Sequence, residues 1–221
     1  MDDYLSEKEQ WERLQNWLKV NGPWIVAGVA AGALVLGGWR WWQAHTDELA
    51  SQASAQSRQI AEAFGRHDRA HALALLDKLQ REQPKSPYVN QANLIAARAY
   101  VEAGELDKAA ATLKTIMETT SDHALALVAR ERLARVQIAQ HAPDAALATL
   151  AAVDPGSFAP SYHEVRADAF EAKKDFASAL KEYRAARAAD ATGTVDPERL
   201  DLKISDLVAD EPAPHAAAGA K

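Results

Sequence analysis

A long run without charge near the N-terminus constrains this chain more than any other feature of its sequence. The run, Asn21–Trp39, has 19 residues and no charged side chain. As a helix it would reach roughly 28 Å, close to the ~30 Å hydrocarbon thickness of a bilayer. Tryptophans, whose amphipathic rings settle at the headgroup level, mark both ends: Trp24, Trp39, Trp41 and Trp42. Arg40 lies among them and can extend its charge toward water. The sequence therefore predicts a transmembrane helix over residues 21–42.

Two other interpretations of the run fit less well. A buried helix of a globular protein would not need tryptophans at both ends. A cleaved signal peptide has a short basic segment before its apolar part. Here twenty residues precede the run, and five of them are acidic: Asp2, Asp3, Glu7, Glu9 and Glu12. No small-x-small cleavage site follows the tryptophans cleanly, so we expect an uncleaved anchor.

The basic residues on the two sides of the span predict its orientation. Lys8, Arg13 and Lys19 precede it, whereas Arg40 and Arg58 are the only basic residues in the next twenty or so. Positive charge collects on the cytoplasmic side of membrane proteins. By this small excess we expect residues 1–20 in the cytoplasm and the rest of the chain on the far side of the membrane.

Two smaller features accompany the anchor. Ser6 and Glu9 form a capping-box pattern ahead of an apolar face of Trp11, Leu14 and Leu18. This segment either lies on a membrane surface or partner, or is a short solvated helix. Gly28 and Gly32 form a GxxxG pattern, which lets another helix approach closely.

The remainder of the chain repeats. Four segments carry an alanine followed four residues later by a bulky side chain: Ala72 and Leu76, Ala109 and Leu113, Ala146 and Leu150, Ala179 and Tyr183. The alanines are 37, 37 and 33 residues apart. An amphipathic stretch precedes each segment: His45–Phe64, Tyr88–Ala103, His123–Gln140 and Ser161–Lys173. A small residue lets two helices cross closely while the bulky one fills the space beside it. Since no pair can bury its apolar stripe alone, neighbouring pairs should stack into a solenoid.

The pattern resembles the tetratricopeptide repeat, most clearly in AARAYVEAGELDKAAATLKTI. We therefore expect an all-α fold, with an N-terminal transmembrane helix and then a tetratricopeptide-like right-handed α-solenoid over residues 43–209. A four-helix bundle would also explain amphipathic helices but not the regular spacing. Asp196-Pro197 predicts a terminal capping helix, and the Ala/Pro/Gly-rich residues 210–221 predict a disordered tail.

No pattern in the sequence indicates catalysis. The chain has no cysteine, which excludes disulfides, thiolate metal sites and a Cys nucleophile. His67 and His71 are one helical turn apart, but no glutamate lies between them as in the zincin motif. No Gly-rich phosphate loop or nucleophile elbow occurs, and the net charge of −6 argues weakly against a nucleic-acid partner. We expect a non-enzymatic protein without a cofactor or metal.

A binding surface is the natural alternative. In tetratricopeptide arrays the first helix of each pair lines a concave groove. Carried onto this sequence, that arrangement places eight residues in a candidate peptide-binding groove: Phe64, Arg98, Val101, Glu131, Arg135, Ile138, Glu164 and Asp168. The mixture of both charges with apolar side chains suits an extended or partly unfolded polypeptide. Several of the eight could equally cover the core or face water.

The whole chain is similar to the YfgM family, the ancillary SecYEG translocon subunits of Gram-negative bacteria. The resemblance covers nearly the whole chain. It rests on the opening run with Tyr4, Glu7, Glu9, Gln10, Glu12, Leu14 and Trp17, on the G-W-x-W-W motif that closes the span, and on ARAYVEAGELDKAAATL. It implies an inner-membrane protein with periplasmic repeats that associates with SecYEG and the periplasmic chaperone PpiD and passes on newly exported chains. A tetratricopeptide scaffold for another envelope assembly complex, without client binding, is the second hypothesis.

Overall fold

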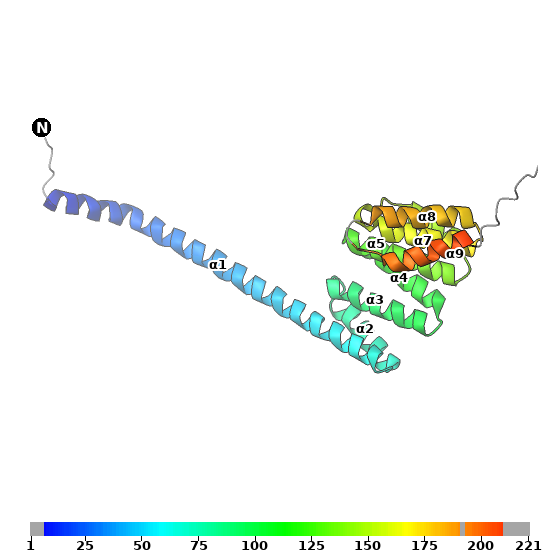
Figure 1. Cartoon of the computed structure of the whole chain (residues 1–221). Coiled ribbons are helices and arrows are strands. Elements are labelled where there is room, and N and C mark those ends of the chain that lie inside the picture. The colour runs from blue at the N-terminus through cyan, green and yellow to red at the C-terminus, as the bar shows by residue number, and fades with distance from the viewer. Residues whose placement is uncertain (1–6, 191–192, 210–221) are drawn as a thin grey trace, which may run out of the picture. The chain divides into compact units, whose positions relative to one another are not determined.

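The computed structural model describes residues 7–190 and 193–209 of the 221-residue chain. These residues form helices and no strand, so the predicted all-α fold class is confirmed. The chain divides into two compact units, Met1–Ser54 and Ala55–Lys221. The helices are labelled in Figure 1.

The first unit consists of most of α1, a continuous helix over Glu7–Gly65 that ends in the second unit. Within it lies a stretch long and apolar enough to cross a membrane, and none of that stretch is buried. Trp24 is 79% exposed, as expected for a surface that meets lipid rather than protein. Trp39 packs beside Trp42 with ring centroids 5.6 Å apart, and the ring of Trp41 stacks on His45 at 5.9 Å.

Three segments that the sequence analysis treats separately, residues 7–20, the span 21–42 and the stretch from His45, form one helix in the structure. Pro23 lies inside this helix. Its ring removes one backbone N–H and crowds the carbonyl four residues back, which bends a helix without ending it here. Beyond the tryptophans no Gly or Pro interrupts the good helix formers Gln, Glu and Ala before Gly65. Ser6 of the expected capping box lies outside the described residues.

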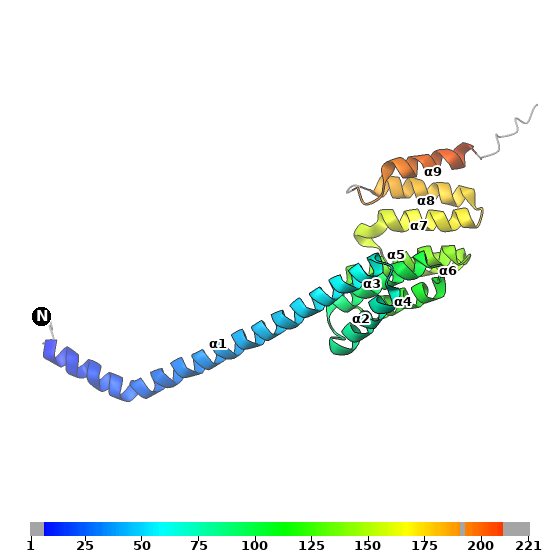
Figure 2. The same ribbon diagram turned by 90° about the horizontal axis from the view of Figure 1, so that it is seen from below.

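The second unit contains helices that follow one another in pairs. The end of α1 precedes α2 (Arg69–Glu82), α3 (Pro87–Glu102) precedes α4 (Leu106–Thr119), α5 (His123–Ala139) precedes α6 (Pro143–Ala151), and α7 (Ala159–Ala172) precedes α8 (Phe176–Ala189). A short 3₁₀ turn, Gly156–Phe158, leads into α7. Figure 2 shows α7, α8 and the last helix, α9 (Pro197–Ala209), stacked in chain order.

The alternation of small and bulky residues explains how each pair closes. The four repeat alanines, Ala72, Ala109, Ala146 and Ala179, are all fully buried. The bulky residues four positions on are at most 7% exposed. Clusters then join successive pairs, since Ala97 of α3, Leu113 of α4 and Leu133 of α5 share one core. The stacked-pair architecture expected from the spacing is therefore present.

The turn between the two helices of each pair has the same backbone conformation in all four pairs. His67, Gly104, His141 and Lys174 each lie five residues before a repeat alanine, with φ of 61°, 74°, 60° and 62°. In every turn the next residue donates its N–H to the carbonyl five positions back at 2.9 Å, as from Glu105 to Tyr100. This is the hydrogen bond that defines a Schellman helix end. Only the second pair places glycine at this left-handed position.

Helix α9 covers the end of the array and begins at Pro197, where the Asp196-Pro197 pair predicts a helix start. Its Leu200 and Leu207 are buried with Tyr183 and Ala186 of α8. A terminal helix of this kind hides an apolar edge that another repeat would otherwise cover. The expected disordered tail, 210–221, lies outside the described residues.

Candidate functional site

An open cleft lies between α3 and α5 in the described part of the second unit. Its volume is about 740 Å³. Its lining residues are Gln91, Leu94, Ile95, Ala97, Arg98, Val101, Leu113, Arg132, Arg135, Val136 and Ala139. Three of the eight groove residues expected from the sequence, Arg98, Val101 and Arg135, meet here.

The two walls of the cleft are single helix faces. On α3 the lining positions 91, 94, 95, 98 and 101 recur every three or four residues, as do 132, 135, 136 and 139 on α5. Leu113 of α4 forms part of the floor and is buried. The cleft thus lies between the first helices of two neighbouring pairs.

The interior of the cleft is mostly apolar and partly open to solvent. Val101 is 41% exposed although its side chain is fully apolar. Leu94 is half-buried against the core below it, and Val136 is buried in that core. Exposed apolar surface in a concave site indicates a place for a ligand's apolar groups.

The polar groups of the cleft are arginines together with one glutamine. Arg98 pairs with Glu102 on its own helix, with Nε 2.7 Å from Oε1, and its side chain is 80% exposed. Arg135 pairs with Glu131 at 2.9 Å. Arg132 is exposed, and no ion pair or hydrogen bond of its side chain occurs within the described residues. Sequence reasoning missed Arg132, although it lies one helical turn from Arg135 and Val136 in the same amphipathic stretch.

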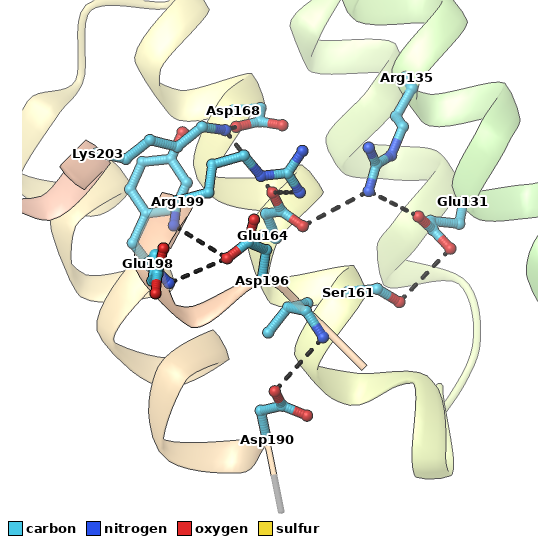
Figure 3. A network of polar contacts seen from close by, with 12 residues as sticks. Glu131, Arg135, Ser161, Glu164, Asp168, Asp190, Asp196, Glu198, Arg199 and Lys203 are labelled. Atoms are coloured by element: carbon cyan, nitrogen blue, oxygen red, sulfur yellow. Dashed lines mark hydrogen bonds and ion pairs between the residues drawn. The ribbon is translucent and has the colours of Figure 1, made fainter. Parts of the chain in front are cut away.

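The acidic residues expected in the groove lie elsewhere, in the polar network of Figure 3. The carboxylate of Glu164 on α7 is only 2% exposed and has three basic neighbours. Arg199 donates to it at 2.6 Å, Arg135 lies 3.6 Å away, and Lys203 lies 3.8 Å away. Because a buried carboxylate is costly unless it is paired, these cations hold Glu164 in its place.

Asp168 belongs to the same network. Lys203 of α9 donates to its Oδ1 at 2.5 Å, and so does the Tyr183 hydroxyl at 2.5 Å. Burial and the carboxylates of Asp168 and Glu171 raise the pKa of Tyr183, so this hydroxyl stays protonated and remains a donor. Glu164 and Asp168 are thus occupied by α9 and do not face an open groove.

The remaining expected groove residues are also apart from the cleft. Glu131 is mostly covered and accepts from Ser161 at 3.5 Å as well as pairing with Arg135. Ile138 packs against the cluster shared by α5, α6 and α7. Phe64 is half-buried near the end of α1 and does not line the cleft.

No group of three or more potential metal-ligating side chains occurs among residues 7–190 and 193–209. His67 occupies the left-handed turn position before α2, whereas His71 lies within that helix. The backbone N–H of His71 is bonded to the Asp68 carboxylate, which caps α2. The role of these residues in the described structure is to build the turn and its cap.

The chain is similar to known proteins over nearly its full length. The family model described as a tetratricopeptide repeat-like domain matches residues 15–209. The ancillary SecYEG translocon subunit of Escherichia coli (strain K12) is 32% identical over 209 residues, which cover 94% of this chain and 99% of that protein. The ancillary SecYEG translocon subunit of Neisseria gonorrhoeae is 29% identical over 208 residues, covering 94% and 100%.

A solved structure shares the fold. The MamA RS-1 ArsTM double mutant superposes with a TM-score of 0.51 at 13% sequence identity. The match covers 71% of this chain and 93% of that one. At this identity the likeness concerns the arrangement of helices alone.

Proposed function

The chain belongs to the family of ancillary SecYEG translocon subunits, and we propose that it is a non-enzymatic, membrane-anchored adaptor of that translocon. The apolar part of α1 holds it in the inner membrane beside SecYEG. The repeat domain contacts newly exported polypeptides through the cleft between α3 and α5. It then passes them to periplasmic chaperones, with PpiD as the expected partner.

One observation carries this proposal: the same chain has an apolar helical stretch of membrane-spanning length with no buried residue and a repeat domain with an open, largely apolar cleft. Anchoring makes weak binding sufficient, because a short connection raises the local concentration of one partner toward the millimolar range. The basic residues before the span favour a cytoplasmic N-terminus and a periplasmic repeat domain.

The cleft's role is tested by filling it. In Val101→Trp a larger side chain takes up space in the cleft without changing its charge, and Val101 is exposed enough to accept it. The matched control is Val208→Trp on α9, because Val208 is 45% exposed and does not line the cleft. We expect site-specific crosslinking to exported chains to fall for Val101→Trp and to persist for Val208→Trp.

The anchor's role is tested separately. Exchange of residues 24–42 for an unrelated span should lower recovery of SecYEG from gently solubilised membranes, whereas Val101→Trp should leave that recovery unchanged. If Val101→Trp crosslinks to exported chains as well as the control does, the cleft is not the client site. Co-purification of a different stoichiometric complex in place of SecYEG would support the scaffold function instead.

A further inference from the structure

The charges of the cleft between α3 and α5 are all of one sign. Arg98 on one wall and Arg132 and Arg135 on the other are its charged lining residues, and no lining residue is acidic. The chain as a whole carries a net charge of −6, so this concentration of positive charge is local. We propose that the cleft selects short polypeptide segments in which carboxylate side chains alternate with apolar ones. This inference rests on the proposed function and specifies the ligand of its site.

Two of the three arginines can accept a carboxylate at little cost. The Arg132 side chain has no partner to give up within the described residues. Arg98 would exchange Glu102, four residues on along the same exposed helix face, for an incoming carboxylate. Exposed pairs of this spacing contribute little to stability, so the exchange is inexpensive. Guanidinium groups bind carboxylates through two parallel N–H donors, which favours acidic residues over neutral amides.

The third arginine has a different position. Arg135 lies between Glu131 at 2.9 Å and the buried Glu164 at 3.6 Å. These two carboxylates fix its guanidinium. Arg135 therefore adds positive electrostatic potential to the cleft but offers no free pair of N–H donors. Figure 3 shows its guanidinium between them. The ligand contacts should therefore come mainly from Arg98 and Arg132.

The size of the cleft limits the segment it holds. The lining of α3 runs from residue 91 to 101, about 15 Å of helix, and that of α5 from 132 to 139, about 10 Å. This length matches two to three turns of a helix or about four extended residues. Apolar side chains of such a segment would cover Val101 and Leu94. The carboxylates of the segment would meet Arg98 and Arg132.

Basic segments gain little attraction at two places in the repeat domain. At the cleft they meet arginines. Beyond α5, the carboxylates of Glu164 and Asp168, which would attract them, are already taken by Arg199 and Lys203 of the same chain. The selection therefore depends on the cleft and not on the net charge of the domain.

The test uses the full chain in nanodiscs of zwitterionic lipid and three fluorescein-labelled peptides of about ten residues, long enough to place about four extended residues in the cleft. The peptides share their Leu and Ala residues and carry Glu, Gln or Lys at the same alternate positions. We expect the Glu peptide to bind on the order of tenfold more tightly than the Gln peptide, and the Lys peptide to bind most weakly.

Charge reversal in the cleft should abolish this order. In Arg132→Glu we expect the Glu peptide to lose on the order of tenfold in affinity, while the Lys peptide gains. The matched control is Arg184→Glu on α8: Arg184 is also an exposed arginine with no side-chain partner in the described chain, and it lies outside the cleft. Unchanged thermal unfolding of both variants would show that the fold is intact.

Each other result overturns the inference in a distinct way. If the three peptides bind equally and Val101→Trp abolishes binding, the cleft binds polypeptide without regard to charge, and the proposed function survives alone. If no peptide responds to Val101→Trp or Arg132→Glu, both proposals fail. Displacement of the Glu peptide by phosphatidylglycerol in the nanodisc would assign the cleft to anionic lipid. Dimers that dissociate on Arg132→Glu would assign it to a second copy of the chain.

Discussion

Replacement of the glycine in the second turn by alanine should destabilise the repeat domain by about 1 kcal/mol. Gly104 has φ of 74°, in the left-handed region, and an added Cβ would meet no atom within 4 Å. The change therefore adds backbone strain without a clash. An L-residue in this conformation costs about 1–2 kcal/mol, and the loss of freedom in the unfolded chain returns about 0.4–1 kcal/mol. The difference is close to 1 kcal/mol.

Thermal unfolding of the full chain in detergent micelles, followed by circular dichroism, measures this effect. For a domain of this size, about 1 kcal/mol lowers the Tm by roughly 2–4 °C. The control is Gly65→Ala at the end of α1, where φ is not positive and an added Cβ also meets nothing within 4 Å. Because alanine favours helix, this control should leave the Tm unchanged or raise it. A drop in Tm of the same size for both variants would refute the assignment of the effect to the left-handed turn.

Two further predictions concern the same turns. Ala142 precedes α6 at the position where Asp68 and Asp175 cap α2 and α8, and α6 has no side-chain cap. Ala142→Asp should therefore raise the free energy of unfolding by about 1 kcal/mol, as measured by denaturant unfolding. An unchanged midpoint would show that the carboxylate does not reach the N–H of Ala145. Hydrogen bonds from Arg69, and then from Lys108, lower the pKa of Glu105 from 4.5 to about 2. The ionised carboxylate therefore stabilises the fold fully above pH 4.5, and this stabilisation is lost as the pH falls toward 2. The Tm difference between the wild type and Glu105→Gln should vanish over this window, and a difference that persists at pH 2 would contradict the prediction.

The sequence predicts the helix pairing because the cause of the pairing is local. Ala109 and Leu113 lie one turn apart on one helix, and close crossing requires a small and then a large residue at that spacing. The same relation holds at Ala72, Ala146 and Ala179, all fully buried. Four occurrences at nearly equal intervals exclude chance better than any single motif does.

The turns were less predictable, because tertiary packing decides their conformation. Gly104 indicates a left-handed residue in the sequence because glycine favours that conformation. At the equivalent positions of the other turns, residues with a side chain adopt a similar positive φ: His67, His141 and Lys174. Histidine adopts positive φ more often than most residues, but this preference is weak and lysine does not share it. The position becomes visible only when each turn is counted from its buried alanine, five residues further along the chain.

The residues predicted for the groove lie in more than one place in the structure. Arg98, Val101 and Arg135 line the cleft, but Glu164 and Asp168 are paired with Arg199 and Lys203, some 35 residues further along the chain. Partners at that separation depend on where α9 packs, which periodicity alone does not give. Arg132 was missed for a related reason, since whether an exposed arginine faces a cleft depends on the neighbouring helix pair.

The cleft lies between α3 and α5, and the first helices are joined differently there than between α5 and α7. Between α5 and α7 the backbone is bridged directly: the Tyr162 hydroxyl donates to the Leu127 carbonyl at 2.9 Å, and burial raises the pKa of this hydroxyl to about 12, so it stays a donor. Between α3 and α5 the shared core is formed largely by α4 side chains such as Leu113 and Ile116. The first helices are therefore held together at one place and separated at the other.

Arg135 belongs to both regions. It lines the cleft on one side of α5 and pairs with the buried Glu164 of α7 on the other. Glu164 in turn accepts from Arg199 of α9. A rigid wall follows from this arrangement, because α5 cannot rotate without exposing a buried carboxylate to a poorer set of partners. One wall of the cleft, α5, is thus held in place by the helix pairs that follow it. On the other wall, α3, Arg98 can exchange its partner Glu102 for a ligand. On the proposed function, recognition of a segment would then cost little reorganisation of the domain, which suits weak and repeated binding.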